Sequence, residues 1–153
     1  MKWFALLLAL PLLLLSGGLL LNRPPLLSPP GPLDRLKAYL TTNVAETRLD
    51  HEFPELRPPL VPADVTQTTD AVVRAMSSLG WTEIQAMEGE VRSIVVSPLF
   101  RFRDDVTVRV ENAEGGTLLY ARSASRVGKG DVGANAGHLK ALFAEVERLL
   151  RLR

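Results

Sequence analysis

An uncharged, leucine-rich run from Trp3 to Leu21 is the feature that most limits what this chain can fold into. A helix of these 19 residues is about 28 Å long, at about 1.5 Å per residue, and this is close to the ~30 Å hydrocarbon core of a bilayer. Lys2 and the terminal amine precede the run, which favours the N-terminus inside and the C-terminus outside the cell, although Arg23 weakens this asymmetry. The run predicts an N-terminal membrane helix.

Two interpretations of residues 1–22 are open, a signal anchor and a cleaved signal peptide. Ser16, Gly17 and Gly18 offer a cleavage site, but it is not of the Ala-x-Ala type and it lies inside the apolar run, which favours the anchor. A buried core helix is disfavoured because core helices are rarely this long without a charge. Under either interpretation we expect the domain on the extracytoplasmic side of a bacterial cytoplasmic membrane, exported if the N-terminus is cleaved.

The composition excludes several classes of function. Without Lys2, 17 of the 18 basic residues remain against 17 acidic ones, and a neutral domain lacks the basic footprint that nucleic-acid binding requires. The sequence has no Cys, which excludes disulfides, thiolate catalysis and thiolate metal sites. The two histidines, His51 and His138, stand in no metal-ligand motif. We expect no nucleic-acid partner, no metal and no cofactor.

Residues 23–42 are predicted to form a proline-rich spacer that ends in a short helix. Five prolines lie between Arg23 and Pro32, a composition typical of a stiff, extended linker. Three leucines then recur at helical spacing between positions 33 and 40, and they predict a short helix with an apolar stripe.

Residues 43–153 are predicted to form a single α+β domain. Val106, Val108 and Val110 alternate with polar residues, the pattern of a half-buried strand. The elements expected in order are an optional edge strand near 57–61, a helix over 64–79, strands over 81–87, 90–97, 104–111 and 117–127, and a helix over 131–150. Hairpin connections make the four strands an antiparallel meander, and one apolar stripe per helix places both helices on one face.

Seven polar residues are candidates for a site on this sheet. They are Arg109, Arg122, Arg126 and Asn135, with the acidic residues Asp104, Asp105 and Asp131. One interpretation is a lattice of desolvated salt bridges, in which Arg122 or Arg126 pairs with an acidic residue and Asn135 bonds the backbone of the 127–131 turn. The other is an anion site of arginines and turn amides near a helix N-terminus. Asp131 disfavours the second because its carboxylate would compete with the anion.

Two further motifs carry weaker signals. Residues 128–133 match the G-x-G-x-x-G dinucleotide pattern, but no strand with an acidic residue follows, so we expect a tight turn with positive φ at Gly128 or Gly130 and Asp131 as helix cap. Ser123 and Ser125 have only the two histidines as bases, at no recognisable spacing. No residue is assigned a catalytic role.

Several stretches resemble one known family. They are Phe102 to Val106 with Arg109, the string Arg-Ser-Ala-Ser-Arg-Val-Gly-x-x-Asp-x-Gly-x-Asn from Arg122 to Asn135, and the segments 43–47 and 54–56. The chain thereby closely resembles the bacterial and plastid family called domain of unknown function 1499. The resemblance implies a small exported or membrane-associated domain without an established activity. The family usually has Arg three residues after the Asn, where this chain has His138, which we expect to be solvated beside the core stripe.

Two functional hypotheses follow from these observations. The first is a membrane-tethered accessory or interaction domain, attached through its N-terminal helix, with an envelope protein complex as its partner. The second is a small-anion or small-ligand binding protein, or a hydrolase, that uses the Arg/Asp cluster on the sheet. A flat exposed sheet face would favour the first hypothesis, and a deep apolar pocket would favour the second.

Overall fold

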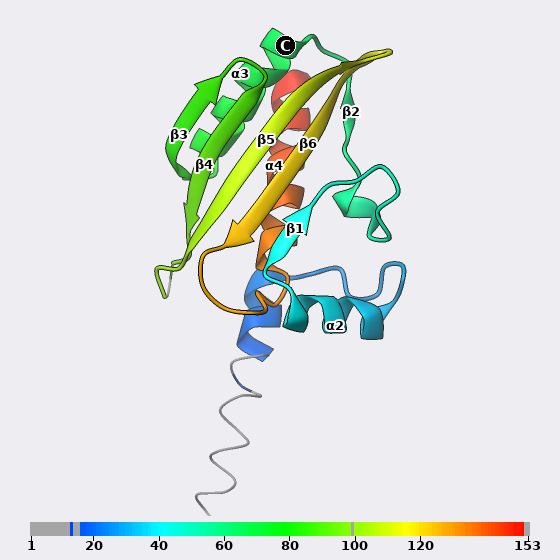
Figure 1. The fold of residues 1–153 in the computed structure, drawn as a ribbon, viewed down its shortest axis with the longest axis vertical. Coiled ribbons are helices and arrows are strands. Elements are labelled where there is room, and N and C mark those ends of the chain that lie inside the picture. Colours follow the sequence, from blue (N-terminus) through cyan, green and yellow to red (C-terminus); the bar gives the residue numbers. More distant parts are fainter. Residues whose placement is uncertain (1–12, 14–15, 99, 152–153) are drawn as a thin grey trace, which may run out of the picture.

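The architecture is an antiparallel sheet with helices packed on one face (Figure 1). The structure, a computed structural model, describes residues 13, 16–98 and 100–151. The sheet has the strand order β1-β6-β5-β4-β3, and β2 also pairs with β6. The predicted α+β class is confirmed, although the sheet is larger than the sequence predicts.

Four consecutive strands form the predicted meander. They are β3 (Thr82–Met87), β4 (Glu90–Val96), β5 (Arg103–Ala113) and β6 (Gly116–Ser125), each antiparallel to the next. In β5, Val106, Val108 and Val110 are buried, whereas Arg109 between them is exposed on the other face, because successive side chains of a strand alternate. From Asp105 onward in β5, the alternation therefore directs the valines toward the helices and the charged side chain of Arg109 away from them.

Two short strands on β6 correct the four-stranded prediction. β1 (Val44–Glu46) pairs with residues 122–124 of β6, and β2 (Leu60–Val61) pairs with residues 117–118, which makes the sheet six-stranded. β2 falls within the predicted edge strand, but β1 lies in a stretch where the sequence predicts no strand or helix. Strands of two or three residues are too short for a period-two pattern to be recognised, and backbone pairing to β6 defines them instead.

Two long helices cover the buried face of the sheet, as predicted. α3 (Val65–Ser78) begins after Asp64, whose Oδ1 accepts a hydrogen bond from the Gln67 amide at 2.8 Å, and it is followed by Gly80 with a φ of 74°. α4 (Ala134–Arg151) crosses behind β6 and packs beside α3 (Figure 1). Fully buried side chains between the helices and the sheet are Val72, Met76, Val91, Val108, Leu119, Leu139, Leu142 and Val146.

The segment before β1 differs from the extended spacer that its prolines predict. Residues 26–30 form turns, and α2 (Pro32–Thr41) packs on the domain near the 3-10 helix η1 (Pro54–Leu56). The leucine spacing correctly predicts that α2 forms, but it predicts the wrong face of α2 as the buried one. Arg35 and Tyr39 are buried, whereas Leu33 and Leu40 are exposed, because a buried ion pair rather than an apolar stripe anchors α2.

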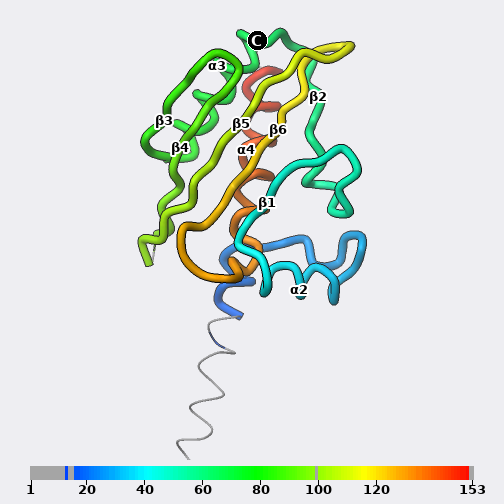
Figure 2. Tube along the Cα trace, viewed as in Figure 1, coloured from blue at the N-terminus to red at the C-terminus, as the bar shows by residue number. Residues whose placement is uncertain are grey.

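Residues 16–22 lie at the end of the domain where α2 lies (Figures 1 and 2). Residues 16–22 are helical. Most of the predicted membrane helix, residues 1–12 and 14–15, falls outside the described residues. Among the residues that the structure does describe, no helix is both long enough and apolar enough to cross a membrane.

Candidate functional site

The helix-free face of the sheet carries the predicted arginines. Arg109 on β5 and Arg122 on β6 are exposed there, and Arg126 follows at the end of β6. Strand pairing places Arg122 opposite Thr107 on one side and Glu46 on the other. The ion pairs of the described residues include Arg109 and Arg126 but not Arg122. These arginines therefore share one open surface, with Arg122 free to contact a partner.

Arg126 forms a bidentate ion pair with Asp105. Its Nε donates to Oδ2 at 2.9 Å and its Nη2 donates to Oδ1 at 2.7 Å. The hydrogen bond from Arg126 lowers the pKa of the Asp105 carboxyl. The predicted pairing of Arg126 with an acidic residue is confirmed, but the expected desolvation is wrong. The two side chains are 46% and 50% exposed, so this is a surface ion pair.

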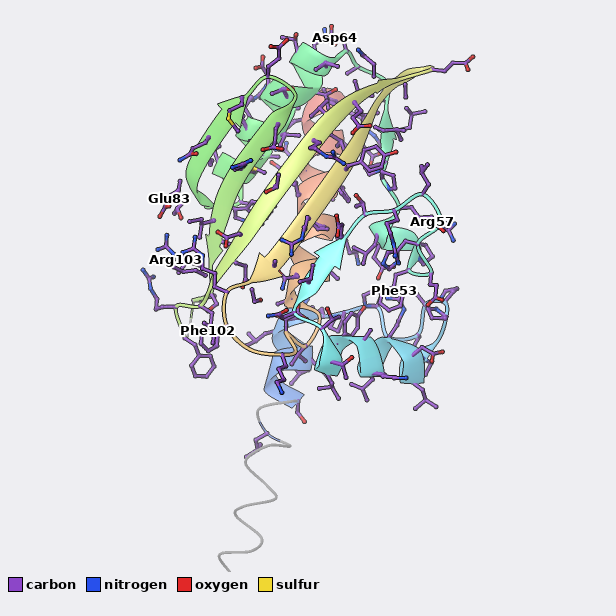
Figure 3. The ribbon with its side chains drawn as sticks, viewed as in Figure 1. Phe53, Arg57, Asp64, Glu83, Phe102 and Arg103 are labelled. Atoms are coloured by element: carbon purple, nitrogen blue, oxygen red, sulfur yellow. The ribbon has the colours of Figure 1, made fainter. Side chains whose placement is uncertain are left out.

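A second ion pair borders the same face at its β3 edge. Arg103, at the start of β5, pairs with Glu83, which has a positive φ of 55° where the β3–β4 register shifts. Figure 3 shows these two side chains near each other, with Phe102 beyond them at the end of the sheet. The face is thus lined by acidic and basic side chains in alternation rather than by one sign of charge.

Two shallow hollows lie on the helix-free face. One, of about 370 Å³, is bordered by Arg109, Tyr120 and Arg122 together with Glu46 and Glu90. The other, of about 290 Å³, lies between β3, β4 and β5 and is lined mainly by polar side chains. Both hollows are open to solvent and carry mixed charge. Neither has the enclosed apolar lining that small-molecule pockets usually have.

Asn135 lies on the opposite, helix-covered side of the sheet and is fully buried. Its Nδ2 donates to the Asn43 carbonyl at 2.8 Å and to Ser125 Oγ at 2.9 Å, and its Oδ1 accepts from Ser123 Oγ. The predicted bond from the Asn135 side chain to the backbone of the 127–131 turn is wrong, because Asn43 donates to the Gly128 carbonyl instead, at 2.6 Å. The sheet therefore separates Asn135 from the arginines, and its amide connects α4 to β6 and to the residue before β1.

His138 is half-buried beside this network and not solvated as predicted. Its Nδ1 lies 3.4 Å from Ser123 Oγ and 3.7 Å from Asp104 Oδ2. Burial lowers the pKa of His138, against the opposing effect of the Asp104 and Asp131 carboxylates. A Ser-His-Asp relay requires the Ser and the Asp on different ring nitrogens. Here Ser123 and Asp104 both face Nδ1 of His138, and Ser123 is fully buried. This geometry therefore does not activate Ser123 as a nucleophile.

The three acidic residues of the predicted cluster have three separate roles. Asp105 forms the surface ion pair, whereas Asp104 is buried beside His138, with an Oδ1 that has no hydrogen-bond partner among the described residues. Asp131 caps α4 as predicted, because its two carboxylate oxygens accept from the amides of Gly133 at 2.8 Å and Asn135 at 2.9 Å. The Asp131 carboxylate thus accepts hydrogen bonds from the same backbone amides that a bound anion would need.

The turn between β6 and α4 has the predicted glycine with a positive φ. Gly128 has a φ of 98°, in the region that favours glycine, and Gly133 has a φ of 79°. The glycines thus serve a tight strand-to-helix turn.

Sequence reasoning missed a second buried polar centre, at Arg35. Its guanidinium is fully buried and donates to both carboxylate oxygens of Glu55, at 2.5 and 3.0 Å, and to the Tyr39 hydroxyl at 2.9 Å. It also donates to the Pro29 carbonyl at 2.6 Å, and it lies 4.3 Å from the Phe53 ring centre. Burial raises the pKa of Glu55, but hydrogen bonds from Arg35 and from the backbone leave it lowered overall. No sequence spacing indicates this pairing, because its partners come from three separate segments.

Within the described residues, no three His, Cys, Asp or Glu side chains gather as a metal site. Residues 34–146, from α2 into α4, match the family described as "Protein of unknown function (DUF1499)". No curated protein matches the chain significantly. The family match covers the strings from which the resemblance was inferred, and the chain belongs to the DUF1499 family.

Proposed function

We propose that this protein is a membrane-tethered, extracytoplasmic interaction domain that binds a protein of the cell envelope through the helix-free face of its sheet. The observation that carries the proposal is a broad sheet face, uncovered by any helix of the described residues, on which Tyr and Arg stand among acidic side chains. Tyr and Arg are enriched at protein interfaces, where they supply much of the binding energy. The charged and aromatic residues that border the hollow on this face are Glu46, Glu90, Arg109, Tyr120 and Arg122.

A protein partner suits this face better than a small ligand does. A small ligand is normally held in a concave, largely apolar pocket that buries most of its surface. The hollow between Arg109, Tyr120 and Arg122 is open, and Glu46 and Glu90 border it as well. A free anion would meet repulsion from the two carboxylates, whereas a protein surface with complementary charges satisfies both signs at once.

Membrane tethering is supported by the uncharged run from Trp3 to Leu21 and by the way the chain continues from it. Asn22 Nδ2 donates to the carbonyls of Asp131 and Val132, at 3.3 and 3.0 Å. The end of the helical segment is therefore fastened to the loop before α4. A tether of this kind would hold the domain close to the outer surface of a bacterial cytoplasmic membrane.

The tether is tested by washing native membranes with high salt and with carbonate. We expect the chain to stay in the membrane fraction, with its N-terminal peptide detected intact by mass spectrometry. Recovery of a soluble protein that begins at Leu19 would reject the anchor and leave export alone.

The partner surface is tested by placing a photo-crosslinking amino acid at position 122 and, as a control, at position 74, an exposed residue of α3. We expect a discrete protein adduct from position 122 and none from position 74 in intact cells. Arg109→Glu in the position-122 variant should abolish the adduct with only a small fall in melting temperature, because Arg109 is exposed and its ion pair with Glu111 is a surface pair. Equal adducts from both positions, or an adduct that survives the charge reversal, would reject this face as the binding surface.

A further inference from the structure

The end of the domain at which residues 16–22 lie exposes several large apolar side chains. Phe100 is 59% exposed, Phe102 is 50%, Val127 is 66% and Leu33 is 81%. They belong to the β4–β5 loop, the β6–α4 loop and α2. Figures 1 and 2 show these three segments at the same end of the long axis as residues 16–22, opposite the β5–β6 hairpin.

Backbone hydrogen bonds join these segments into one continuous surface. The Arg126 amide donates to the Arg103 carbonyl at 3.1 Å, which ties the β6–α4 loop to the strand after the β4–β5 loop. The Val132 amide donates to the Tyr39 carbonyl at 3.0 Å, which ties the same loop to α2. Asn22 completes the set through its bond to the Val132 carbonyl. The exposed apolar side chains are thus held in a fixed relation to the N-terminal helix.

The two phenylalanines are held outward by a closed turn. The Ser97 amide donates to the Phe102 carbonyl at 2.8 Å, and the Phe102 amide donates to Ser97 Oγ at 2.9 Å. Arg101 between the rings has a positive φ of 57°. The rings stack with centres 5.6 Å apart and planes 26° apart. Neither ring is part of the core cluster, so their exposure is set by the turn and not by packing.

Exposed basic side chains accompany these apolar ones. Lys37 on α2, Arg101 in the β4–β5 loop and Lys129 in the β6–α4 loop lie in the same three segments, and Arg23 follows the helical residues 16–22. Asp34 is the exposed acidic residue of α2. The ion pairs found among the described residues use none of these four cations. Exposed apolar and aromatic side chains, together with Lys and Arg side chains, are the combination that binds the interface of an anionic bilayer.

We propose that this end of the domain rests on an anionic membrane surface, with Phe100, Phe102 and Val127 entering the headgroup region and Arg101 and Lys129 contacting lipid phosphates. The inference rests on the proposed tether and adds an orientation to it. The domain would stand with its long axis away from the bilayer and the β5–β6 hairpin farthest from it. The helix-free face would then be open sideways to a partner.

The absence of Cys from the sequence permits a direct test with single labels. The full chain, reconstituted in phosphatidylglycerol and phosphatidylethanolamine vesicles, carries an environment-sensitive fluorophore at Phe102→Cys or, as the control, at Glu114→Cys in the distal hairpin. Nitroxide lipids near the headgroups should quench the label at 102 about threefold more strongly than the label at 114. A third label, at Val127→Cys, should lose much of its quenching when Phe100 and Phe102 are both changed to Ser.

The outcomes separate this inference from the tether on which it rests. A chain that floats with the vesicles while its label at 102 is quenched no more than the label at 114 overturns the surface contact alone. A label that is shielded from water but not quenched by lipid shows that another copy of the chain, and not lipid, covers this end, and it also overturns the inference. A chain that does not float with the vesicles overturns both proposals. Circular dichroism of each variant confirms that the quenching is measured on folded protein.

Discussion

Arg126 and Asp105 face each other across β6 and β5 as a bidentate ion pair on the helix-free side of the sheet. Arg122 lies on β6, four residues before Arg126 and on the same face, but no ion pair of the described residues includes it. The two arginines can therefore be compared directly. Arg126 forms an ion pair within the sheet, whereas Arg122 is available to a partner.

The first prediction concerns these two arginines. Arg126→Ala should lower the melting temperature slightly at low salt, because Asp105 loses its partner, and about 0.5 M NaCl should remove the difference by screening an exposed pair. Arg122→Ala should leave the melting temperature unchanged at both salt concentrations. Differential scanning fluorimetry measures both. A larger loss from Arg122→Ala than from Arg126→Ala would contradict the assignment of the two side chains.

Sequence patterns predicted the elements whose regularity extends over a whole strand or helix. The alternation of Val106, Val108 and Val110 placed the buried face of β5 correctly, and the apolar stripes placed both long helices on one side. The pattern failed for β1, which is three residues long, and for the buried face of α2, where a charged residue is inside. Short-range periodicity carries no information about an ion pair between residues far apart in the chain.

The candidate site was predicted in its parts but not in its arrangement. The sequence indicated that Arg126 would pair with an acidic residue and that Asp131 would cap α4. It did not place Asn135 on the opposite side of the sheet from the arginines, or His138 beside Asp104. These positions depend on how α4 packs beneath β6, which is a tertiary contact that no local spacing encodes.

The second prediction concerns the buried ion pair between Arg35 and Glu55. Arg35→Met should lower the free energy of unfolding by about 3 kcal/mol or more, because it leaves the Glu55 carboxylate without its partner in a largely buried site. Arg35→Met with Glu55→Gln should recover part of that loss. Urea unfolding followed by circular dichroism measures both. A double variant that is less stable than Arg35→Met would show that the lost packing of Arg35, and not an unpaired carboxylate, causes the effect.

The third prediction concerns Gly130, where a Cβ would lie 2.4 Å from the Leu40 carbonyl oxygen, a backbone atom that cannot rotate away. Gly130→Ala should therefore destabilise the protein by about 2 kcal/mol or more. Gly128→Ala, at a φ of 98°, should cost about 1 kcal/mol. Gly137→Ala, within α4, should be neutral or stabilising because Ala favours helix. Equal free energies of unfolding for Gly130→Ala and Gly137→Ala would contradict the close approach of α2 to this turn.

The fourth prediction concerns pH and His138. Its pKa in the folded protein is below the ordinary value of 6.5, because burial outweighs the Asp104 and Asp131 carboxylates that face it. Between the folded and unfolded pKa values the unfolded chain binds more protons. The stabilising effect of the neutral ring is therefore fully present above about pH 6.5 and decreases as the pH falls below it. His138→Gln should reduce this slope, and adding His51→Gln should reduce it further, because the pKa of His51 is also lowered by burial.

The variant His138→Arg distinguishes two effects on stability. One is the protonation of the His138 ring, and the other is the missing hydrogen-bond donor to Asp104. A guanidinium stays charged throughout this range, so the pH slope should be as small as in His138→Gln. It also offers donors to Asp104, whose buried Oδ1 has no hydrogen-bond partner among the described residues, so this variant should be more stable than His138→Gln by about 1 kcal/mol. Urea unfolding across the pH range measures both effects. Equal stability of the two variants, together with an unchanged slope in His138→Gln, would show that neither the ring's proton nor the carboxylate of Asp104 controls the stability of this network.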